Sequence, residues 1–250
     1  MLKIRTYEGG AGVPLLMAHG LFGSARNFGP LARRLAADRT VHVVDMRNHG
    51  DSPWQYGQSY PAMADDLAEV IESLVGPMAV FGHSMGGKAA MVLALTRPEL
   101  VAALVVGDIA PVAYGHSHLA HVRAMQAVDL AAIASRRDAD ALLAVEDAGV
   151  RAFLLQSLDL AEKRWKLNLS VLGRDMDLIT GWPAVTGRYD GPVLFLAGSE
   201  SDYVDNRDAA LALFPQAEFQ VIEGAGHWLH ADKPAETAAA LAAFLNQPPS

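Results

Sequence analysis

The sequence predicts an α/β fold built around a doubly wound, mostly parallel β-sheet. Short apolar segments of strand length alternate with segments of helix length through most of the 250 residues. Strands that are apolar along their whole length are typical of parallel sheets, because helices cover both faces of such a sheet. A run of helical segments near the middle of the chain interrupts the alternation, which then resumes. We therefore expect a sheet domain that carries a helical insertion.

The first part of the chain follows the βα order closely. Residues 2–7 alternate apolar and polar side chains, as a half-buried edge strand does. Pro30 suits the first turn of a helix, and Gly76 suits the end of another. Further strands are expected at residues 13–20, 40–50, 77–82 and 101–111, and helices at 30–39, 61–76 and 84–99.

The alternation of expected strands and helices stops after Pro111. Apolar residues then recur every three or four positions, which predicts helices at residues 118–134, 138–149 and 150–158. Strands return at 191–198 and 217–227, and helices at 207–215 and 233–246. We therefore assign residues 1–111 and 186–250 to the sheet domain, and residues 112–185 to a helical lid inserted after the sixth strand.

Composition limits the classes of partner. The chain is 51% hydrophobic and 19% charged, so it can bury a large core. Its formal net charge of −8 argues against nucleic acid or an anionic membrane surface as a partner. Cysteine is absent, and no apolar run is long enough to cross a membrane. The first residues do not resemble a signal peptide, so we expect a cytoplasmic protein. Composition does not predict the oligomeric state.

Ser84 is the candidate nucleophile. It lies in VFGHSMGGKAA, residues 80–90, between an expected strand and an expected helix, with Gly82 and Gly86 on either side. A serine in such a sharp turn projects its hydroxyl above the sheet, and the helix start directs backbone N–H groups toward developing negative charge. A turn that served packing alone would not require a serine at its centre. One oxyanion donor is then the backbone N–H of Met85, the residue after the nucleophile.

His227 is the candidate general base. In a fold of this kind the order along the chain is serine, then acid, then histidine. His227 follows an expected last strand on a glycine-rich loop, whereas His230, three residues later, is expected to be a packing or capping residue. The group His116, His118 and His121 fits no standard zinc spacing, so we expect it on the lid surface, with a metal site as the alternative. We expect neither a metal nor a cofactor.

Two aspartates compete for the role of triad acid. Asp108 ends the strand that follows the serine-bearing helix, and Asp202 follows the first strand after the insertion. Both positions are carboxyl ends of strands, where a sheet of this class builds its site. We assign Asp108 and keep Asp202 as the alternative, because Asp202 lies one residue beyond the usual spacing from Gly198.

Motifs along nearly the whole chain resemble those of the α/β-hydrolases, and among them the bacterial and mitochondrial esterases. They are HGLFGSARNF (19–28), VDMRNHGDSP (44–53), GHSMGGKAAM (82–91), RPELV (97–101), DIAPV (108–112), GWPAV (181–185) and GAGHWLHADKP (224–234). The resemblance implies the α/β-hydrolase fold and supports Asp108 as the acid. It also implies Leu21 as the second oxyanion donor and Phe22 as a wall of the acyl pocket.

The expected activity is hydrolysis of short- to medium-chain carboxylic esters or thioesters through a Ser-His-Asp acyl-enzyme. Tyr203, Trp228 and Trp182 are candidates for an apolar substrate pocket, although a core position is the more common one for any single residue of this kind. The same triad also serves C–C bond hydrolases and perhydrolases. A ligand receptor of this fold with residual turnover is a further alternative. The expected partner is a small-molecule ester.

Overall fold

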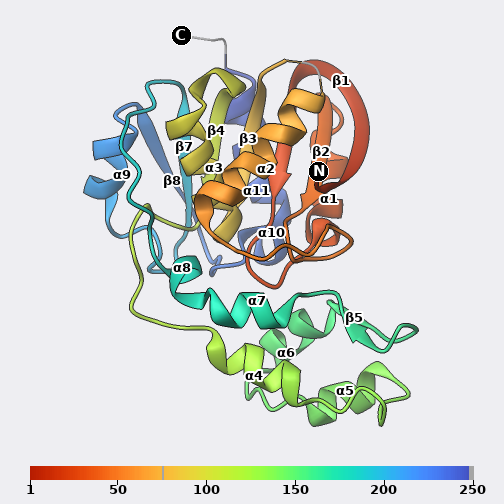
Figure 1. Cartoon of the computed structure of the whole chain (residues 1–250). Helices are drawn as coiled ribbons and strands as arrows, with labels where there is room; N and C mark the ends of the chain where they lie inside the picture. The colour runs from red at the N-terminus through yellow and green to blue at the C-terminus, as the bar shows by residue number, and fades with distance from the viewer. Residues whose placement is uncertain (75, 248–250) are drawn as a thin grey trace.

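The computed structural model describes residues 1–74 and 76–247, and its centre is a six-stranded sheet with helices on both faces (Figure 1). The strand order is β2-β1-β3-β4-β7-β8, and the pairs from β1 through β3, β4 and β7 to β8 are parallel. The strands are β1 (Lys3–Ala18), β2 (Arg39–Asp45), β3 (Met78–His83), β4 (Val101–Gly107), β7 (Val193–Gly198) and β8 (Ala217–Ile222). The mostly parallel sheet predicted from the sequence is confirmed.

β1 is one strand of 16 residues, although the sequence predicts two strands in this region. Its first part pairs with β2 from Lys3↔Asp45 to Tyr7↔Val41, and its last part pairs with β3 from Leu15↔Ala79 onward. The chain therefore turns within a continuous strand instead of breaking into two. The helical segments follow β4, the fourth strand along the chain, so the predicted position after the sixth strand is wrong; the continuity of β1 accounts for one of the two strands.

Helices cover the two faces of the sheet and bury two apolar clusters against it (Figure 1). α2 (Tyr60–Ser73), α3 (Met85–Thr96) and α9 (Arg207–Leu213) contribute to one cluster, and α1 (Gly29–Leu35), α10 (Leu229–Asp232) and α11 (Pro234–Leu245) contribute to the other. Two short 3₁₀ helices are η1 (Ala25–Phe28) and η2 (Pro98–Leu100). No helix in the described ranges is both long enough and apolar enough to cross a bilayer.

The glycines beside Ser84 permit α3 to approach the sheet closely. A side chain at Gly86 would place its Cβ 2.3 Å from the Ala18 carbonyl oxygen, and one at Gly82 would place it 2.2 Å from the Gly86 carbonyl oxygen. Every residue of β3 is buried, as expected for a strand covered on both faces. Glycine at these two positions therefore lets the chain turn directly from β3 into α3.

The inserted segment, residues 112–185, lies across the end of the sheet where β3 and β4 finish (Figure 1). Its elements are α4 (Leu119–Ala127), α5 (Arg136–Leu142), α6 (Ala148–Leu155), β5 (Leu158–Asp159), β6 (Arg164–Trp165), α7 (Leu169–Arg174) and α8 (Met176–Thr180). The expected helices over 118–134 and 138–149 are both shorter. Asp129 accepts a hydrogen bond from the Ala131 amide in a turn, and Asp147 caps a new helix by accepting from the Val150 amide.

Hydrogen bonds attach the inserted segment to the sheet domain, and two groups of them involve α3 and the turn after β2. On α3, the buried Lys88 ammonium donates to the carbonyl oxygens of Thr180, at 3.1 Å, and Gly181, at 2.6 Å. On the turn after β2, the Gly50 amide donates to the Lys166 carbonyl at 2.8 Å, and the Asn168 amide donates to the Asn48 carbonyl at 2.9 Å. Both attachments lie close in sequence to expected site motifs.

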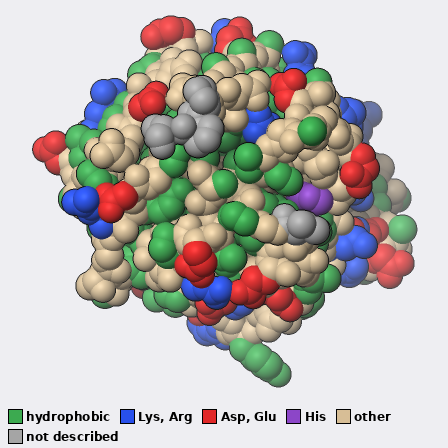
Figure 2. Space-filling model, turned by 90° about the horizontal axis from the view of Figure 1, so that it is seen from above, with side chains coloured by type: hydrophobic (Ala, Val, Ile, Leu, Met, Phe, Trp, Pro, Cys, Tyr) green, Lys and Arg blue, Asp and Glu red, His purple; other side chains and the backbone are tan. Residues whose placement is uncertain are grey.

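The face opposite the inserted segment carries acidic and basic side chains mixed with hydrophobic ones (Figure 2). This interspersed pattern differs from the single-sign surface that binds polyanions. Residues 248–250, which we include in the sheet domain, lie outside the described residues.

Candidate active site

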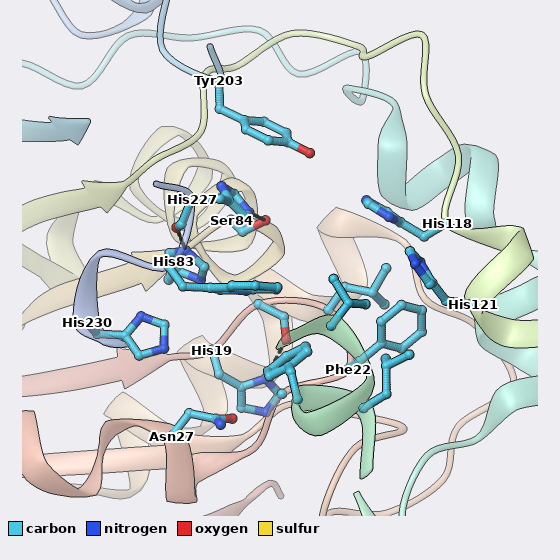
Figure 3. Close-up of a pocket in the computed structure, with 17 residues that line it drawn as sticks. His19, Phe22, Asn27, His83, Ser84, His118, His121, Tyr203, His227 and His230 are labelled. Atoms are coloured by element: carbon cyan, nitrogen blue, oxygen red, sulfur yellow. Dashed lines mark hydrogen bonds between the residues drawn. The ribbon is translucent and has the colours of Figure 1, made fainter. Parts of the chain in front are cut away.

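Ser84, His227 and Asp108 form a continuous hydrogen-bonded chain above the sheet, and Figure 3 shows the first two of them. The Ser84 hydroxyl lies 3.0 Å from Nε2 of His227, and Nδ1 of His227 lies 2.7 Å from a carboxylate oxygen of Asp108. Ser84 follows β3, Asp108 follows β4, and His227 lies on the loop after β8. The structure therefore brings together the three residues that the sequence singles out as nucleophile, acid and base.

The backbone is strained at two of these three residues. Ser84 has φ 52° and ψ −118°, and Asp108 has φ 51°, both in a region that residues other than glycine rarely adopt. Such conformations cost roughly 1–3 kcal/mol each and persist only where neighbouring contacts hold them. The Ser84 amide donates to the Gly107 carbonyl at 2.9 Å, and the Asp108 amide donates to the Leu196 carbonyl at 2.7 Å. These bonds fix both side chains above the strand ends.

Asp108 is completely buried and fully engaged. Besides the bond to His227, one carboxylate oxygen accepts the Gly198 amide at 2.9 Å and the other accepts the Ser201 hydroxyl. Three donors compensate for the loss of hydration that a buried carboxylate otherwise suffers. Asp202, the alternative acid, is exposed on the same loop. Ser201 was not predicted as a site residue, although it lies three residues after Gly198, at the usual spacing of an acid.

The His227 ring is held between two other rings. Tyr203 stacks on it with ring centroids 4.2 Å apart, and His83 lies 4.8 Å away on a tilted plane. Nε2 of His83 is also 2.7 Å from the backbone carbonyl oxygen of His227. Because these contacts fix both the ring and its backbone, Nε2 of His227 stays directed at the Ser84 hydroxyl.

The loop that contains Leu21 is braced by two buried histidines. His19 accepts the Met46 amide at Nε2, so its Nδ1 donates to the Gly20 carbonyl. His49 accepts the Phe22 amide at Nε2, so its Nδ1 donates to the Arg47 carbonyl. Neither histidine was predicted as a site residue.

Two backbone amides are available beside the nucleophile. In the described ranges, the amides of Leu21 and Met85 donate to no other protein group. Both residues lie next to Ser84 along one small cavity. The positive φ of Phe22, 63°, turns the chain immediately after Leu21. Two amides without a protein acceptor, on residues that line the same cavity as Ser84, are candidates for an oxyanion hole.

Burial keeps both bracing histidines uncharged. It lowers the pKa of His19 to about 4 and that of His49 to about 3, because neither imidazolium could be hydrated in the interior. Neutral rings are also what the hydrogen bonds need, since each ring accepts at one nitrogen and donates at the other.

A pH effect on stability follows from these lowered pKa values. In the unfolded chain His49 is protonated below about pH 6.5, whereas in the folded protein it stays neutral down to about pH 3. The free energy of unfolding therefore decreases as the pH falls through this window. Between pH 7.5 and 5.0 we expect the free energy of unfolding of His49→Gln to decrease by about 2 kcal/mol less than that of the wild type. Urea unfolding at the two pH values measures this, and equal losses would show that His49 titrates normally when folded.

A cavity of about 250 Å³ opens beside Ser84, between the sheet domain and the inserted segment (Figure 3). Of the predicted pocket residues, Phe22, Tyr203 and Trp228 line it, together with Leu21 and with Phe153 and Leu154 of α6. Trp182 does not line it and instead packs, partly buried, against the main core. The bonds from Lys88 to Thr180 and Gly181 hold that segment over α3, away from the cavity.

The histidines of the inserted segment divide between two environments. His118 and His121 line the cavity and face the Phe22 ring edge to face, so the expected surface position is wrong for these two. His116 is exposed, and its Nε2 lies 2.9 Å from the Tyr203 hydroxyl. Among the described residues, no group of three or more potential ligand side chains has the geometry to hold a metal ion.

The comparisons with known proteins agree with this architecture. Residues 15–240 match the model of the alpha/beta hydrolase family. The chain belongs to this family. Its six-stranded sheet, with Ser84 after β3, is therefore an α/β-hydrolase fold, as the motifs imply.

Relatives of this α/β-hydrolase are named as esterases and lipases. It is 42% identical to a mouse protein named sn-1-specific diacylglycerol lipase ABHD11, over 98% of this chain and 85% of the relative. It is also 42% identical to Esterase YbfF of Escherichia coli, over 93% of each chain. A solved structure named marine microorganism esterase superposes with a TM-score of 0.91 at 34% identity, over 97% of this chain and 98% of that one. The prediction of a serine esterase is confirmed.

Proposed function

We propose that this α/β-hydrolase cleaves short- to medium-chain carboxylic esters or thioesters through an acyl-enzyme on Ser84. The observation that carries the proposal is the chain of hydrogen bonds from Ser84 through His227 to buried Asp108, placed at the wall of an apolar cavity. An apolar cavity with a few convergent polar groups is the usual form of a small-molecule site. The esterase and lipase names of the relatives support the same reaction class.

The proposed acylation step uses the groups in their observed order. His227 takes the proton of the Ser84 hydroxyl at Nε2, and the serine oxygen attacks the ester carbonyl carbon. The carbonyl electron pair moves onto the oxygen, where the amides of Leu21 and Met85 bind the negative charge. Each such donor contributes about 3 kcal/mol to transition-state stability. His227 then passes its proton to the departing alcohol.

Deacylation repeats the cycle with water. His227 removes a proton from water, the hydroxide attacks the acyl-enzyme, and the proton returns to Ser84 as the acid leaves. Asp108 stabilises the imidazolium in both steps and holds its Nδ1 proton. These steps use only side chains and backbone amides of this chain.

The inserted segment, residues 112–185, is proposed to act as the lid over this site. Support comes from α4 and α6, which supply His121 and Phe153 to the cavity wall opposite Ser84. Covering the site excludes bulk water, which strengthens the interaction between the backbone amides and the oxyanion. The lid also makes the cavity apolar, which favours acyl chains over charged substrates.

Steady-state hydrolysis of p-nitrophenyl esters from acetyl to dodecanoyl tests the proposal, with Ser84→Ala as the blank. We expect sustained turnover with a maximum at short or medium chain length, because the size of the cavity limits the length of the acyl chain that it can hold. A single burst without turnover would indicate a ligand receptor with residual activity. No reaction at all, with cleavage of a 1,5-diketone instead, would indicate a C–C bond hydrolase.

A further inference from the structure

Polar side chains gather at the two ends of the cavity beside Ser84 (Figure 3). His118 and His121 of the inserted segment lie at one end. His230 and Asn27 lie at the other end, together with His19. Phe22, Phe153 and Trp228 also line the cavity, so these polar side chains lie in a largely aromatic wall. From the sequence, His230 was expected to be only a packing or capping residue.

His230 has an unmet hydrogen-bonding requirement. Its Nδ1 is buried, and in the described part of the chain no hydrogen-bond partner lies within reach of it. The ring is firmly positioned, edge to face against Phe28 at 4.8 Å and against His83 at 5.0 Å. Because Nδ1 is buried, a ligand in the cavity cannot reach it, whereas Nε2 of the same ring forms no hydrogen bond within the described residues and is not buried. Nε2 of this fixed ring is therefore the nitrogen that His230 offers to a ligand in the cavity.

Asn27 offers a second donor at the same end. Its Oδ1 accepts the Ser24 amide at 2.7 Å, and its Nδ2 donates to Oε1 of Gln156 at 2.9 Å. The amide nitrogen carries two hydrogens, so one remains for a ligand. His19 cannot contribute, because the Met46 amide and the Gly20 carbonyl occupy both its nitrogens.

The charge state of His230 decides which ligand chemistry fits. Burial, with a further effect from His227, lowers the pKa of His230 to about 4. The ring is therefore uncharged at neutral pH, and its accessible Nε2 makes one hydrogen bond, as donor or as acceptor according to the tautomer. A hydroxyl group suits either tautomer, and a carbonyl oxygen suits the one in which Nε2 donates. A carboxylate or phosphate would instead require a cation at this end of the cavity.

We propose that His230 and Asn27 form a subsite that binds an uncharged oxygen function, a hydroxyl or a carbonyl, of the ester substrate. The inference rests on the proposed function and narrows its substrate class from plain hydrocarbon esters to oxygenated ones. The oxygen can belong to the acyl chain or to the leaving alcohol, since both occupy the cavity beside Ser84. The recognition chemistry is the same in either case.

Two pairs of esters distinguish these sources. The acyl pair is p-nitrophenyl hexanoate against its analogues hydroxylated at carbon 3 or carbon 6. The alcohol pair is propyl butyrate against glyceryl 1-monobutyrate. We expect the wild type to favour a hydroxylated member of one pair by about tenfold in kcat/KM, as a hydrogen bond in an apolar site provides. The pair that shows the preference identifies the part of the substrate that reaches His230.

Variants test whether the preference for the hydroxylated ester arises at the end of the cavity that contains His230 and Asn27. His230→Phe keeps an aromatic ring but neither nitrogen, and we expect its preference ratio to fall to about one. His230→Gln keeps a donor and an acceptor, and we expect it to retain part of the ratio. His121→Phe makes the matching change at the opposite end, and its ratio should equal that of the wild type. Thermal melts show whether each variant is folded, and the wild-type ratio stands without any variant.

The outcomes separate the inference from the proposed function. If the wild type turns over all the esters without preference, or if His230→Phe keeps the full ratio, the subsite is overturned and the esterase proposal stands. Loss of the ratio in His121→Phe alone would place the oxygen function at the other end and also overturn it. If no ester is hydrolysed faster than by Ser84→Ala, the proposed function fails and the subsite fails with it.

Discussion

Replacing Ser84 with alanine is expected to lower kcat for ester hydrolysis by about 10⁵- to 10⁶-fold. The Ser84 hydroxyl lies 3.0 Å from Nε2 of His227, and the described residues place no other hydroxyl against that nitrogen. Without it no acyl-enzyme forms, and only binding and oxyanion stabilisation assist water. The measurement is kcat for p-nitrophenyl butyrate with enzyme purified from a host that lacks background esterase.

The control for the Ser84→Ala variant is Ser73→Ala. Ser73→Ala removes a serine hydroxyl whose hydrogen bond is to the Val70 carbonyl on α2, remote from the cavity. We expect its kcat to stay within about twofold of the wild type, as for most surface substitutions. If Ser84→Ala kept more than about a hundredth of wild-type kcat, well above the residual activity of a broken triad, another nucleophile would have to be sought.

Asp108→Asn is expected to lower kcat by about 10⁴-fold with little change in fold. The carboxylate accepts from Nδ1 of His227, so the neutral ring keeps Nε2 as the acceptor for the Ser84 proton. An asparagine can turn its amide nitrogen toward Nδ1, which then accepts, and the ring proton moves to Nε2. His227 can no longer take the proton from Ser84.

The alternative acid supplies the control for this second prediction. Asp202 is exposed on the loop that also carries Ser201, and no hydrogen bond joins it to His227 in the described structure. Asp202→Asn should therefore leave kcat within about twofold of the wild type. The measurement is kcat of both variants on one ester. A larger loss of kcat in Asp202→Asn than in Asp108→Asn would show that Asp202, not Asp108, is the acid.

The sequence was most informative where one backbone position dictates both conformation and chemistry. Gly82 and Gly86 mark the close approach of α3 to the sheet, and Ser84 between them must project above it. Asp108 and His227 then follow from strand ends and chain order. These inferences need only local pattern and the rule that parallel strands end on one edge, so the structure could bring all three residues together.

Contacts that depend on how helices pack could not be predicted in this way. Trp182 and His121 both lie in the inserted segment, yet only His121 reaches the cavity, because the direction each faces depends on the placement of α4 and α8. Likewise, nothing local marks His49 as the brace of Phe22, since the two are far apart in sequence. Periodicity also failed at Asp147, where a side-chain cap restarts the helix.

The hydrogen bonds that hold the inserted segment on opposite sides have a consequence for substrate access. Lys88 holds one side through Thr180 and Gly181, and the turn at Asn48 to Gly50 holds the other side through residues 166–168. Because hydrogen bonds hold the inserted segment on both sides, we expect it to stay in place rather than to open as a hinged lid. We therefore expect bulky substrates to react slowly even when their acyl chain fits the cavity. The turn that binds the inserted segment also contains His49, so a movement of that segment would be transmitted to the Phe22 amide, next to the proposed oxyanion donor Leu21.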